Sequence, residues 1–166
     1  MASQFRSKPI SQQRIVITGA SSGIGLATAR LAAERGAKVL LVARNEEDLR
    51  NIVQQIRDRG GRAEYAVADV ADKEALEAAA GKAREAFGGF DAWVNDAGIS
   101  VIDEVERISL EDHRRVFETN YWGAVHGLLI AVREFKARHA STMLTFDAVV
   151  DALEQIEGRQ AAPAAE

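Results

Sequence analysis

A glycine-rich stretch directly after a short apolar run constrains this sequence more than any other feature. Arg14–Thr18 (RIVIT) is apolar and rich in β-branched residues, as buried strands are. Three glycines with the spacing Gly-x-x-x-Gly-x-Gly follow within Gly19–Gly25. From Ile24 to about Arg35 the sequence is rich in alanine and leucine, which predicts a helix. The segment therefore predicts a buried strand, a tight turn and a helix in direct succession.

The glycines also predict what the turn can hold. Residues without a Cβ, here Gly19, Gly23 and Gly25, let the backbone turn tightly and come close to a ligand. The N-terminus of the following helix carries free N–H groups and a partial positive charge, so a pyrophosphate fits there. Ser21 and Ser22 can add hydroxyl donors. We interpret the loop as a nucleotide site; the alternative is an ordinary strand–helix turn.

The strand–helix alternation continues through the first half of the chain. Each predicted helix is closed by glycine or begins at a residue that can cap it, as Asn45 and Asp72 can. Alternating strands and helices form right-handed βαβ units, which indicates a three-layer α/β fold with a parallel sheet of four or five strands. The predicted strands are 14–18, 38–43, 63–67 and 91–95, and the helices between them are 24–35, 46–59 and 73–87.

The second half has a different pattern. Ser109 can cap a helix that starts at Leu110, and one apolar face is predicted to continue to about Arg138 through Phe117, Tyr121, Ala124, Val125, Leu128, Val132 and Phe135. Arg114–Arg115 are interpreted as part of its polar face. Beyond it, Met143–Phe146 is predicted either as a fifth strand followed by a helix over 147–157, or as part of a covering helix. We divide the chain into a flexible arm (1–13), a nucleotide-binding domain (14–138) and a divergent C-terminal helix and tail (139–166).

Composition excludes several classes of function. The 166 residues suffice for one domain, and a net charge of −4 argues against a nucleic-acid partner. The absence of cysteine excludes disulfide scaffolds and thiolate chemistry. No apolar run reaches the length of a membrane span, and the first residues lack a signal-peptide core, so we expect a cytoplasmic protein without a membrane partner. The three histidines are too widely spaced to suggest a metal site.

Four motifs occur together in the order TGASSGIG (18–25), Asp69-Val70, Asn95-Asp96-Ala97-Gly98 and Asn120. As a set they resemble the short-chain dehydrogenase/reductase family over about residues 12–138. The resemblance implies a Rossmann-type fold with the first four strands ordered 3-2-1-4, and it implies hydride transfer between NAD(P)(H) and an alcohol or carbonyl substrate. The cofactor-binding residues that it and the loop chemistry predict are Gly19, Ser21, Ser22, Gly23, Ile24, Gly25, Arg44, Asp69, Val70, Asn95, Ala97 and Gly98.

The resemblance also assigns individual roles. Asp69 and Val70 match the residues at the adenine ring, and Asn95–Gly98 matches the segment that ends the fourth strand beside the cofactor. Asn120 matches the catalytic-site asparagine that helps to hold a proton-relay water. Asp96 departs from the pattern, because the family usually has a second asparagine there. An acid at this position loses the amide donors and adds negative charge.

The end of the second strand indicates which cofactor is preferred. An NAD site needs a carboxylate about 20 residues after the glycine loop to bind the ribose 2′-hydroxyl. Here the sequence Val42-Ala43-Arg44-Asn45 has no acid and offers a guanidinium, which can bind a 2′-phosphate. We predict NADP over NAD; the alternative is that Arg44 is only a surface charge.

The resemblance also implies a catalytic Tyr-x-x-x-Lys pair and a serine at the end of the strand that precedes it, and these groups have no counterpart here. Neither Tyr65 nor Tyr121 has a lysine four residues later, and the serine is also missing. The fold is thus expected to be incomplete relative to the family, with Asn120 the one catalytic-site position and little turnover by this chain alone. The alternatives are a non-enzymatic cofactor-binding or interaction module, which could form a homo-oligomer or a hetero-oligomer through helix 120–138, and a truncated product without selected function.

Overall fold

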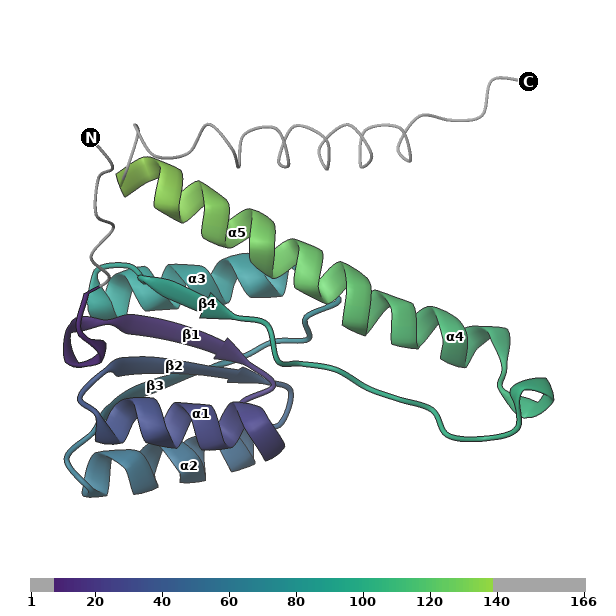
Figure 1. Cartoon of the computed structure of the whole chain (residues 1–166), viewed down its shortest axis with the longest axis horizontal. Coiled ribbons are helices and arrows are strands. Elements are labelled where there is room, and N and C mark those ends of the chain that lie inside the picture. Colours follow the sequence, from purple (N-terminus) through teal and green to yellow (C-terminus); the bar gives the residue numbers. More distant parts are fainter. Residues whose placement is uncertain (1–7, 139–166) are drawn as a thin grey trace, which may run out of the picture.

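A four-stranded parallel sheet with helices on both faces forms the structure, a computed structural model that describes residues 8–138 (Figure 1). The strand order is β3-β2-β1-β4, which confirms the predicted α/β class and the order 3-2-1-4. The strands are β1 (Arg14–Thr18), β2 (Lys38–Ala43), β3 (Arg62–Val67) and β4 (Ala92–Val94). The helices are α1 (Gly23–Glu34), α2 (Glu46–Asp58), α3 (Lys73–Phe87), α4 (Leu110–Phe117) and α5 (Gly123–Arg138).

Side-chain caps fix where three helices begin. Asn45 accepts from the backbone N–H groups of Glu47 and Asp48, and Asp72 accepts from that of Ala75. Ser109 forms a reciprocal capping box with Asp112. These bonds satisfy N–H groups that a helix leaves without an internal partner, so the predicted starts of α2, α3 and α4 are confirmed.

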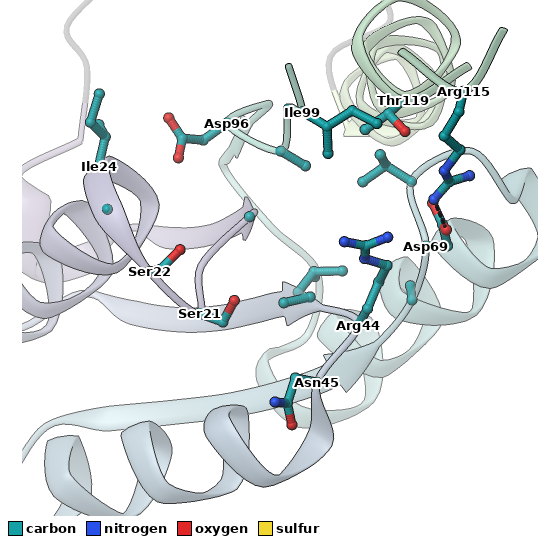
Figure 2. Close-up of a pocket in the computed structure, with 18 residues that line it drawn as sticks. Ser21, Ser22, Ile24, Arg44, Asn45, Asp69, Asp96, Ile99, Arg115 and Thr119 are labelled. Carbon is teal, nitrogen blue, oxygen red and sulfur yellow. Dashed lines mark hydrogen bonds and ion pairs between the residues drawn. The ribbon is translucent and has the colours of Figure 1, made fainter. Parts of the chain in front are cut away.

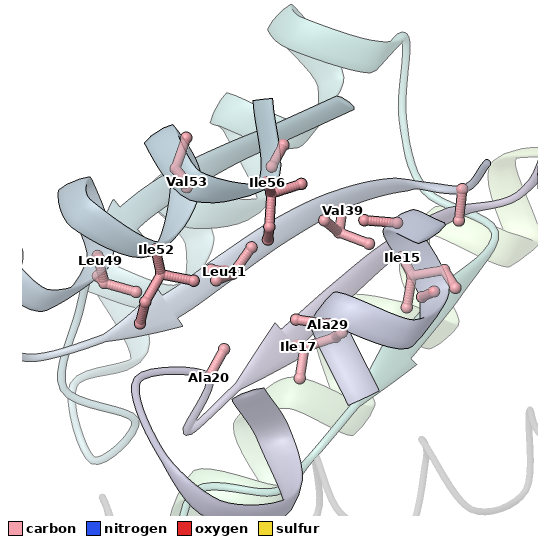
Figure 3. Packing of buried hydrophobic residues seen from close by; sticks show 14 of the residues in the cluster. Ile15, Ile17, Ala20, Ala29, Val39, Leu41, Leu49, Ile52, Val53 and Ile56 are labelled. Atoms are coloured by element: carbon pink, nitrogen blue, oxygen red, sulfur yellow. The ribbon is translucent and has the colours of Figure 1, made fainter. Parts of the chain in front are cut away.

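Two apolar layers hold the helices against the sheet. Helices α1 and α2 cover one face, where Leu49, Ile52, Val53 and Ile56 of α2 pack onto β2 and β3 (Figure 3). Helices α3 and α5 cover the other face around the fully buried ring of Phe90. Burial on both faces explains why the central strands are continuously apolar rather than alternating. The layers leave the carboxyl ends of all four strands at one edge of the sheet.

The sequence predicts a single helix over 110–138, and the structure corrects this prediction. A π-helical turn (Glu118–Trp122) separates α4 from α5. Because a π turn holds an extra residue, it rotates the faces before and after it relative to each other. The predicted apolar face is confirmed only in part: Val125 and Val132 are buried, but Phe117, Tyr121 and Leu128 are exposed, and α4 buries none of its residues.

The N-terminal segment is tied to the sheet from residue 8 onwards. Ile10–Gln12 forms a 3-10 turn, and the carbonyl of Gln13 accepts from the N–H of Lys38. Part of the predicted flexible arm thus has regular structure, while the threefold division of the chain stays a prediction. The strand predicted over 143–146 and the helix predicted over 147–157 lie outside the described residues.

Asp91 anchors this segment at the start of β4. One carboxylate oxygen accepts from the backbone N–H and Nε of Arg14, at 3.0 and 2.8 Å. The other accepts from Nη2 of Arg14 and Nζ of Lys8, at 2.8 and 2.9 Å. The hydrogen bonds from Arg14 lower the pKa of Asp91 far below its usual range, against the opposing effect of burial.

We expect Asp91→Asn to lower the free energy of unfolding by about 2 kcal/mol at pH 7, because it removes charge-assisted bonds from a largely buried site. A carboxyl whose pKa is lowered by folding stabilises the protein above its unfolded-state pKa of about 3.9 and loses that effect at lower pH. Urea unfolding at pH 7 and pH 3 should therefore show the difference from wild type shrinking in acid. The exposed control Asp58→Asn should change little at either pH, and an equal loss in both variants would contradict this expectation.

Candidate functional site

A buried hydroxyl joins the two loops that form the site. Thr18, the last residue of β1, donates from Oγ1 to the carbonyl of Val94 at 3.3 Å. The same oxygen accepts from the N–H groups of Asp96 and Ala97, at 3.1 and 3.2 Å. Since β1 and β4 are neighbours in the sheet, these bonds fasten the glycine loop after β1 to the 95–98 segment after β4.

Gly19 makes this close approach possible. Its φ of +68° is in the left-handed region, and a Cβ on it would lie 2.8 Å from backbone atoms of Ala97. Such a distance is far inside van der Waals contact, so a side chain here would push the two loops apart. The first glycine of the motif is therefore required by packing as well as by the turn.

A cavity of about 570 Å³ opens at the carboxyl ends of the strands, bordered by these loops (Figure 2). In open parallel sheets, ligands bind outside the strand ends where the strand order reverses, and β1 between β2 and β4 is such a point. Ten predicted cofactor residues line it: Gly19, Ser21, Ser22, Gly23, Ile24, Arg44, Asp69, Val70, Ala97 and Gly98. Asp96, Ile99, Arg115 and Thr119 line it as well.

The N-terminus of α1 faces this cavity without a side-chain cap. Ser22 is the N-cap residue, yet its hydroxyl makes no capping bond, unlike the cap residues of α2, α3 and α4. Figure 2 shows the hydroxyls of Ser21 and Ser22 directed toward the cavity. The first amides of α1, with the positive end of its dipole, are left for an anion.

Arg44 is a second group that can hold an anion. Its guanidinium projects into the cavity from the end of β2 (Figure 2), and it has neither a hydrogen bond nor an ion pair within residues 8–138. A guanidinium presents donors in a planar fork that suits phosphate oxygens. The cavity thus contains two separate anion-binding groups, one at α1 and one at Arg44.

Asp69 lies between two cations on the far side of the cavity. Its carboxylate is ion-paired with Arg115 of α4 and also accepts from the N–H of Ala71 at 3.0 Å. Burial raises the pKa of Asp69, but the bonds from Ala71 and Arg115 and the charges of Arg115 and Arg44 outweigh it, so the net pKa is lowered. The carboxylate is therefore ionised at neutral pH and can only accept hydrogen bonds.

Two predicted residues direct their side chains elsewhere. Asn95 donates to the carbonyl of Ala124 at 3.2 Å and accepts from Nε1 of Trp93 at 2.9 Å, so its amide is engaged with α5 and β4. Asn120 donates to the carbonyl of Ile99 and accepts from its N–H, at 2.8 and 2.9 Å. Neither lines the cavity; Asn120 instead fixes the loop after β4 against the π turn.

The remaining predicted residue, Gly25, lies beneath the loop. A Cβ there would lie 2.6 Å from the carbonyl oxygen of Gly19, so it supports the turn and does not line the cavity. Its space is shared with Asp96, whose Oδ2 would be 2.8 Å from the same Cβ. The unusual carboxylate at position 96 thus lies against the first turn of α1.

Arg115 and Thr119 were not predicted as site residues. Arg115 was interpreted as a surface charge, and Thr119 lies in the π turn, which the sequence pattern did not predict. They are four residues apart, so they share one helix face, and both line the cavity. The hydroxyl of Thr119 is buried and has no hydrogen-bond partner among residues 8–138. The four-residue spacing of Arg115 and Thr119 is the sequence signal that could have distinguished their helix face from the solvent-exposed face.

The described residues contain neither a candidate metal site nor a candidate membrane-spanning helix. Within the part of the chain that the structure describes, no group of three or more His, Cys, Asp or Glu side chains could hold a metal ion. In the same residues, no helix combines the length and apolarity required to cross a bilayer. The cytoplasmic location expected from the sequence stays a prediction.

Comparison with known proteins gives consistent matches. The family model described as short chain dehydrogenase matches residues 13–153, extending beyond the resemblance drawn from the motifs. The uncharacterized oxidoreductase YxnA of Bacillus subtilis is 44% identical over 81% of this chain, and 3beta-hydroxysteroid dehydrogenase 1 of Eggerthella lenta is 38% identical over 75%. The crystal structure of L-sorbose reductase from Gluconobacter frateurii, complexed with NADPH and L-sorbose, superposes with a TM-score of 0.71 and 34% identity over 76% of this chain.

These relatives are longer than the present sequence. The chain spans 38% of YxnA, 48% of the steroid dehydrogenase and 48% of the sorbose reductase chain. The matches therefore concern the part that contains the cavity described above.

We expect Arg115→Met to raise the pKa of Asp69 toward its ordinary value, because the substitution removes a hydrogen bond and a positive charge from the carboxylate. The measurement is a carbon-13 NMR titration of the Asp69 carboxyl in the ligand-free protein. Arg114→Met is the matched control, since Arg114 does not line this cavity. Identical titration curves in the two variants would show that the ion pair does not set the charge of Asp69.

Proposed function

The chain belongs to the short-chain dehydrogenase family, and on that premise we propose that it binds NADP(H) in the cavity at the strand ends. The observation that carries the proposal is the pair of separate anion-binding groups, the uncapped N-terminus of α1 and the free guanidinium of Arg44. A dinucleotide with a 2′-phosphate carries negative charge at two such places. The residues present therefore fit the cofactor.

The pyrophosphate would be held by the glycine loop. Amides of the first turn of α1 donate to its oxygens, and Ser21 and Ser22 add hydroxyl donors. Gly19 keeps the loop close to Ala97, so the nicotinamide half would lie along Ala97 and Gly98. Asp96 opposes this arrangement, because its charge lies near the anion site.

The preference for NADP rests on Arg44. No carboxylate occupies the end of β2, and the next acid in the sequence, Glu46, is paired with Arg50 and bonded by Tyr65. A ribose 2′-hydroxyl would therefore lack the acceptor that NAD sites provide, whereas a 2′-phosphate would find a guanidinium. Of the structures compared, the sorbose reductase is one solved with NADPH.

The proposed reaction class is hydride transfer between the nicotinamide and a substrate, with the nicotinamide donating hydride to a carbonyl or accepting it from an alcohol. This chain would contribute binding and orientation of the cofactor. Its sequence contains no Tyr-x-x-x-Lys, so no tyrosine with a lysine beside it is available to protonate the substrate oxygen. Asn120 is the one catalytic-site position, and its amide is engaged by Ile99. We propose little or no turnover by these 166 residues alone.

A non-enzymatic cofactor-binding or interaction module is the second candidate. The exposed apolar side chains of Leu110, Phe117, Tyr121 and Leu128 on α4, the π turn and α5 favour it. Such exposure marks a surface for association with a second copy or with a complete relative. Association through residues 120–138, as the sequence predicts, remains compatible with cofactor binding.

We expect Arg44→Asp to lower the ratio of NADP to NAD affinity by about tenfold or more, since it removes a charge-assisted hydrogen bond to the 2′-phosphate and adds repulsion. The affinities can be measured by calorimetry or from the shift in Tm with each dinucleotide. Arg59→Asp makes the same change of charge away from the cavity and should leave the ratio unchanged. An unchanged ratio in Arg44→Asp would remove the assignment of NADP.

We expect the isolated chain to show no steady-state oxidation of NADPH with small ketones or sugars as substrates. A general acid or base contributes a factor of roughly 10² to 10⁴, and here both the tyrosine and its lysine are absent. NADPH absorbance at saturating cofactor measures this directly. Sustained turnover by the purified chain, abolished by a substitution in the glycine loop, would contradict the expectation.

A further inference from the structure

The carboxylate of Asp96 is a charge in the cavity that no neighbouring side chain compensates. Of the two acids that line the cavity, Asp96 lies beside α1 and Asp69 lies across from it (Figure 2). Oδ2 of Asp96 is 2.8 Å from the position that a Cβ on Gly25 would occupy, so the carboxylate lies over the first turn of α1. Within residues 8–138 this carboxylate has neither a hydrogen bond nor an ion pair, whereas that of Asp69 is paired with Arg115.

The proposed binding mode determines which half of the dinucleotide lies near Asp96. The 2′-phosphate is assigned to Arg44 and the pyrophosphate to the N-terminus of α1, so the adenosine half lies on the side of Arg44. The nicotinamide half then extends past α1 along residues 97–98, which follow Asp96 directly in the chain. Figure 2 shows Arg44, Asp69 and Arg115 on one side of the cavity and Asp96 on the other. Of the charged side chains that line the cavity, Asp96 is therefore the one on the nicotinamide side.

We propose that Asp96 shifts the affinity of the cavity toward the oxidised form of the dinucleotide, NADP⁺, and away from the reduced form, NADPH. The proposal rests on the proposed function, since it requires a dinucleotide in the cavity. The nicotinamide ring is a cation in the oxidised form and is neutral in the reduced form. A carboxylate on the nicotinamide side attracts the cation, and this attraction is lost on reduction. The phosphates carry the same charge in both forms, so their repulsion by Asp96 cancels when the two affinities are compared.

The expected selectivity depends on an acid where the related sequences usually have an amide. Asparagine has nearly the shape of aspartate and no net charge, so it would not distinguish the two forms by electrostatic attraction. The shift is therefore expected from the acid at position 96 of this chain, not from the glycine loop and strand ends of the fold. Because the oxidised form accepts hydride, the shift favours the direction of the proposed reaction class in which an alcohol is oxidised.

The test measures the dissociation constants of NADP⁺ and NADPH by calorimetry in the wild type and in Asp96→Asn. The ratio Kd(NADPH)/Kd(NADP⁺) should be about fivefold higher in the wild type, as expected for one pair of opposite charges in a partly solvated cavity. Asp96→Ser is a second uncharged variant and should give the same ratio as Asp96→Asn, because the effect comes from charge and not from shape. Asp103→Asn removes the same charge from the loop after β4, outside the cavity, and should leave the wild-type ratio unchanged.

Ionic strength supplies a readout that a merely structural role of Asp96 would not change. The Debye length falls from about 10 Å at 0.1 M salt to about 3 Å at 1 M, so the ratio in the wild type should fall toward that in Asp96→Asn as salt is added. An equal gain of affinity for both forms in Asp96→Asn would assign the effect to the pyrophosphate and would overturn the proposal. A difference between the two proteins that persists at 1 M salt would overturn it as well.

Binding of NADP⁺ and NADPH to the wild type is measured first, so that two kinds of failure are distinguished. If the wild type binds neither form, the proposed function fails and this inference fails with it. If the wild type binds both forms and the ratio is the same in Asp96→Asn, the cofactor site stands and only the role of Asp96 is refuted.

Discussion

The arrangement of the site depends on three hydrogen bonds made by one oxygen. Oγ1 of Thr18 bonds to Val94, Asp96 and Ala97, which brings the glycine loop and the segment after β4 together at a buried point of the sheet. Backbone N–H groups at the end of a strand need partners, and the hydroxyl supplies one for two of them. This junction holds Gly19 against Ala97, so that the two loops border one cavity.

On the other side of the cavity, an ion pair between charged side chains holds the wall together. The carboxylate of Asp69 joins the segment after β3 to α4 through Arg115, while the guanidinium of Arg44 projects into the cavity. Asp96 is the exception to this complementarity. Its carboxylate lies against the first turn of α1, near the place where a second negative group is expected. The affinity of the cavity for any anion is therefore a balance between the helix terminus and a fixed acid beside it.

The sequence predicted the sheet and the first three helices because local rules and tertiary packing agree there. Buried parallel strands are continuously apolar, and Asn45, Asp72 and Ser109 cap helices by bonds to their own first turns. Arg115 and Thr119 could not be placed in this way. They approach Asp69 and Val70 because of the π turn and because of Gly123. Gly123 has no Cβ, so α5 can lie closer to Val70 than any side chain at this position would allow. Hydropathy contains no signal for a change in helical phase, so Phe117 and Tyr121 were assigned to the core instead of the surface.

Helix α4 is attached to the rest of the fold in an unusual way. It buries none of its residues, and among the described residues the ion pair of Arg115 with Asp69 is the side-chain bond that attaches it to the segment after β3. Free energies of local opening scale with such attachments, so amide protons of α4 should exchange with solvent far faster than those of β1 and β2. A ligand that contacts Arg115 and Thr119 would have to order this segment as it binds. Ordering α4 would lower its conformational entropy, and the observed affinity of the ligand would be weaker for that reason. Slower amide exchange in α4 would then report that the cavity is occupied.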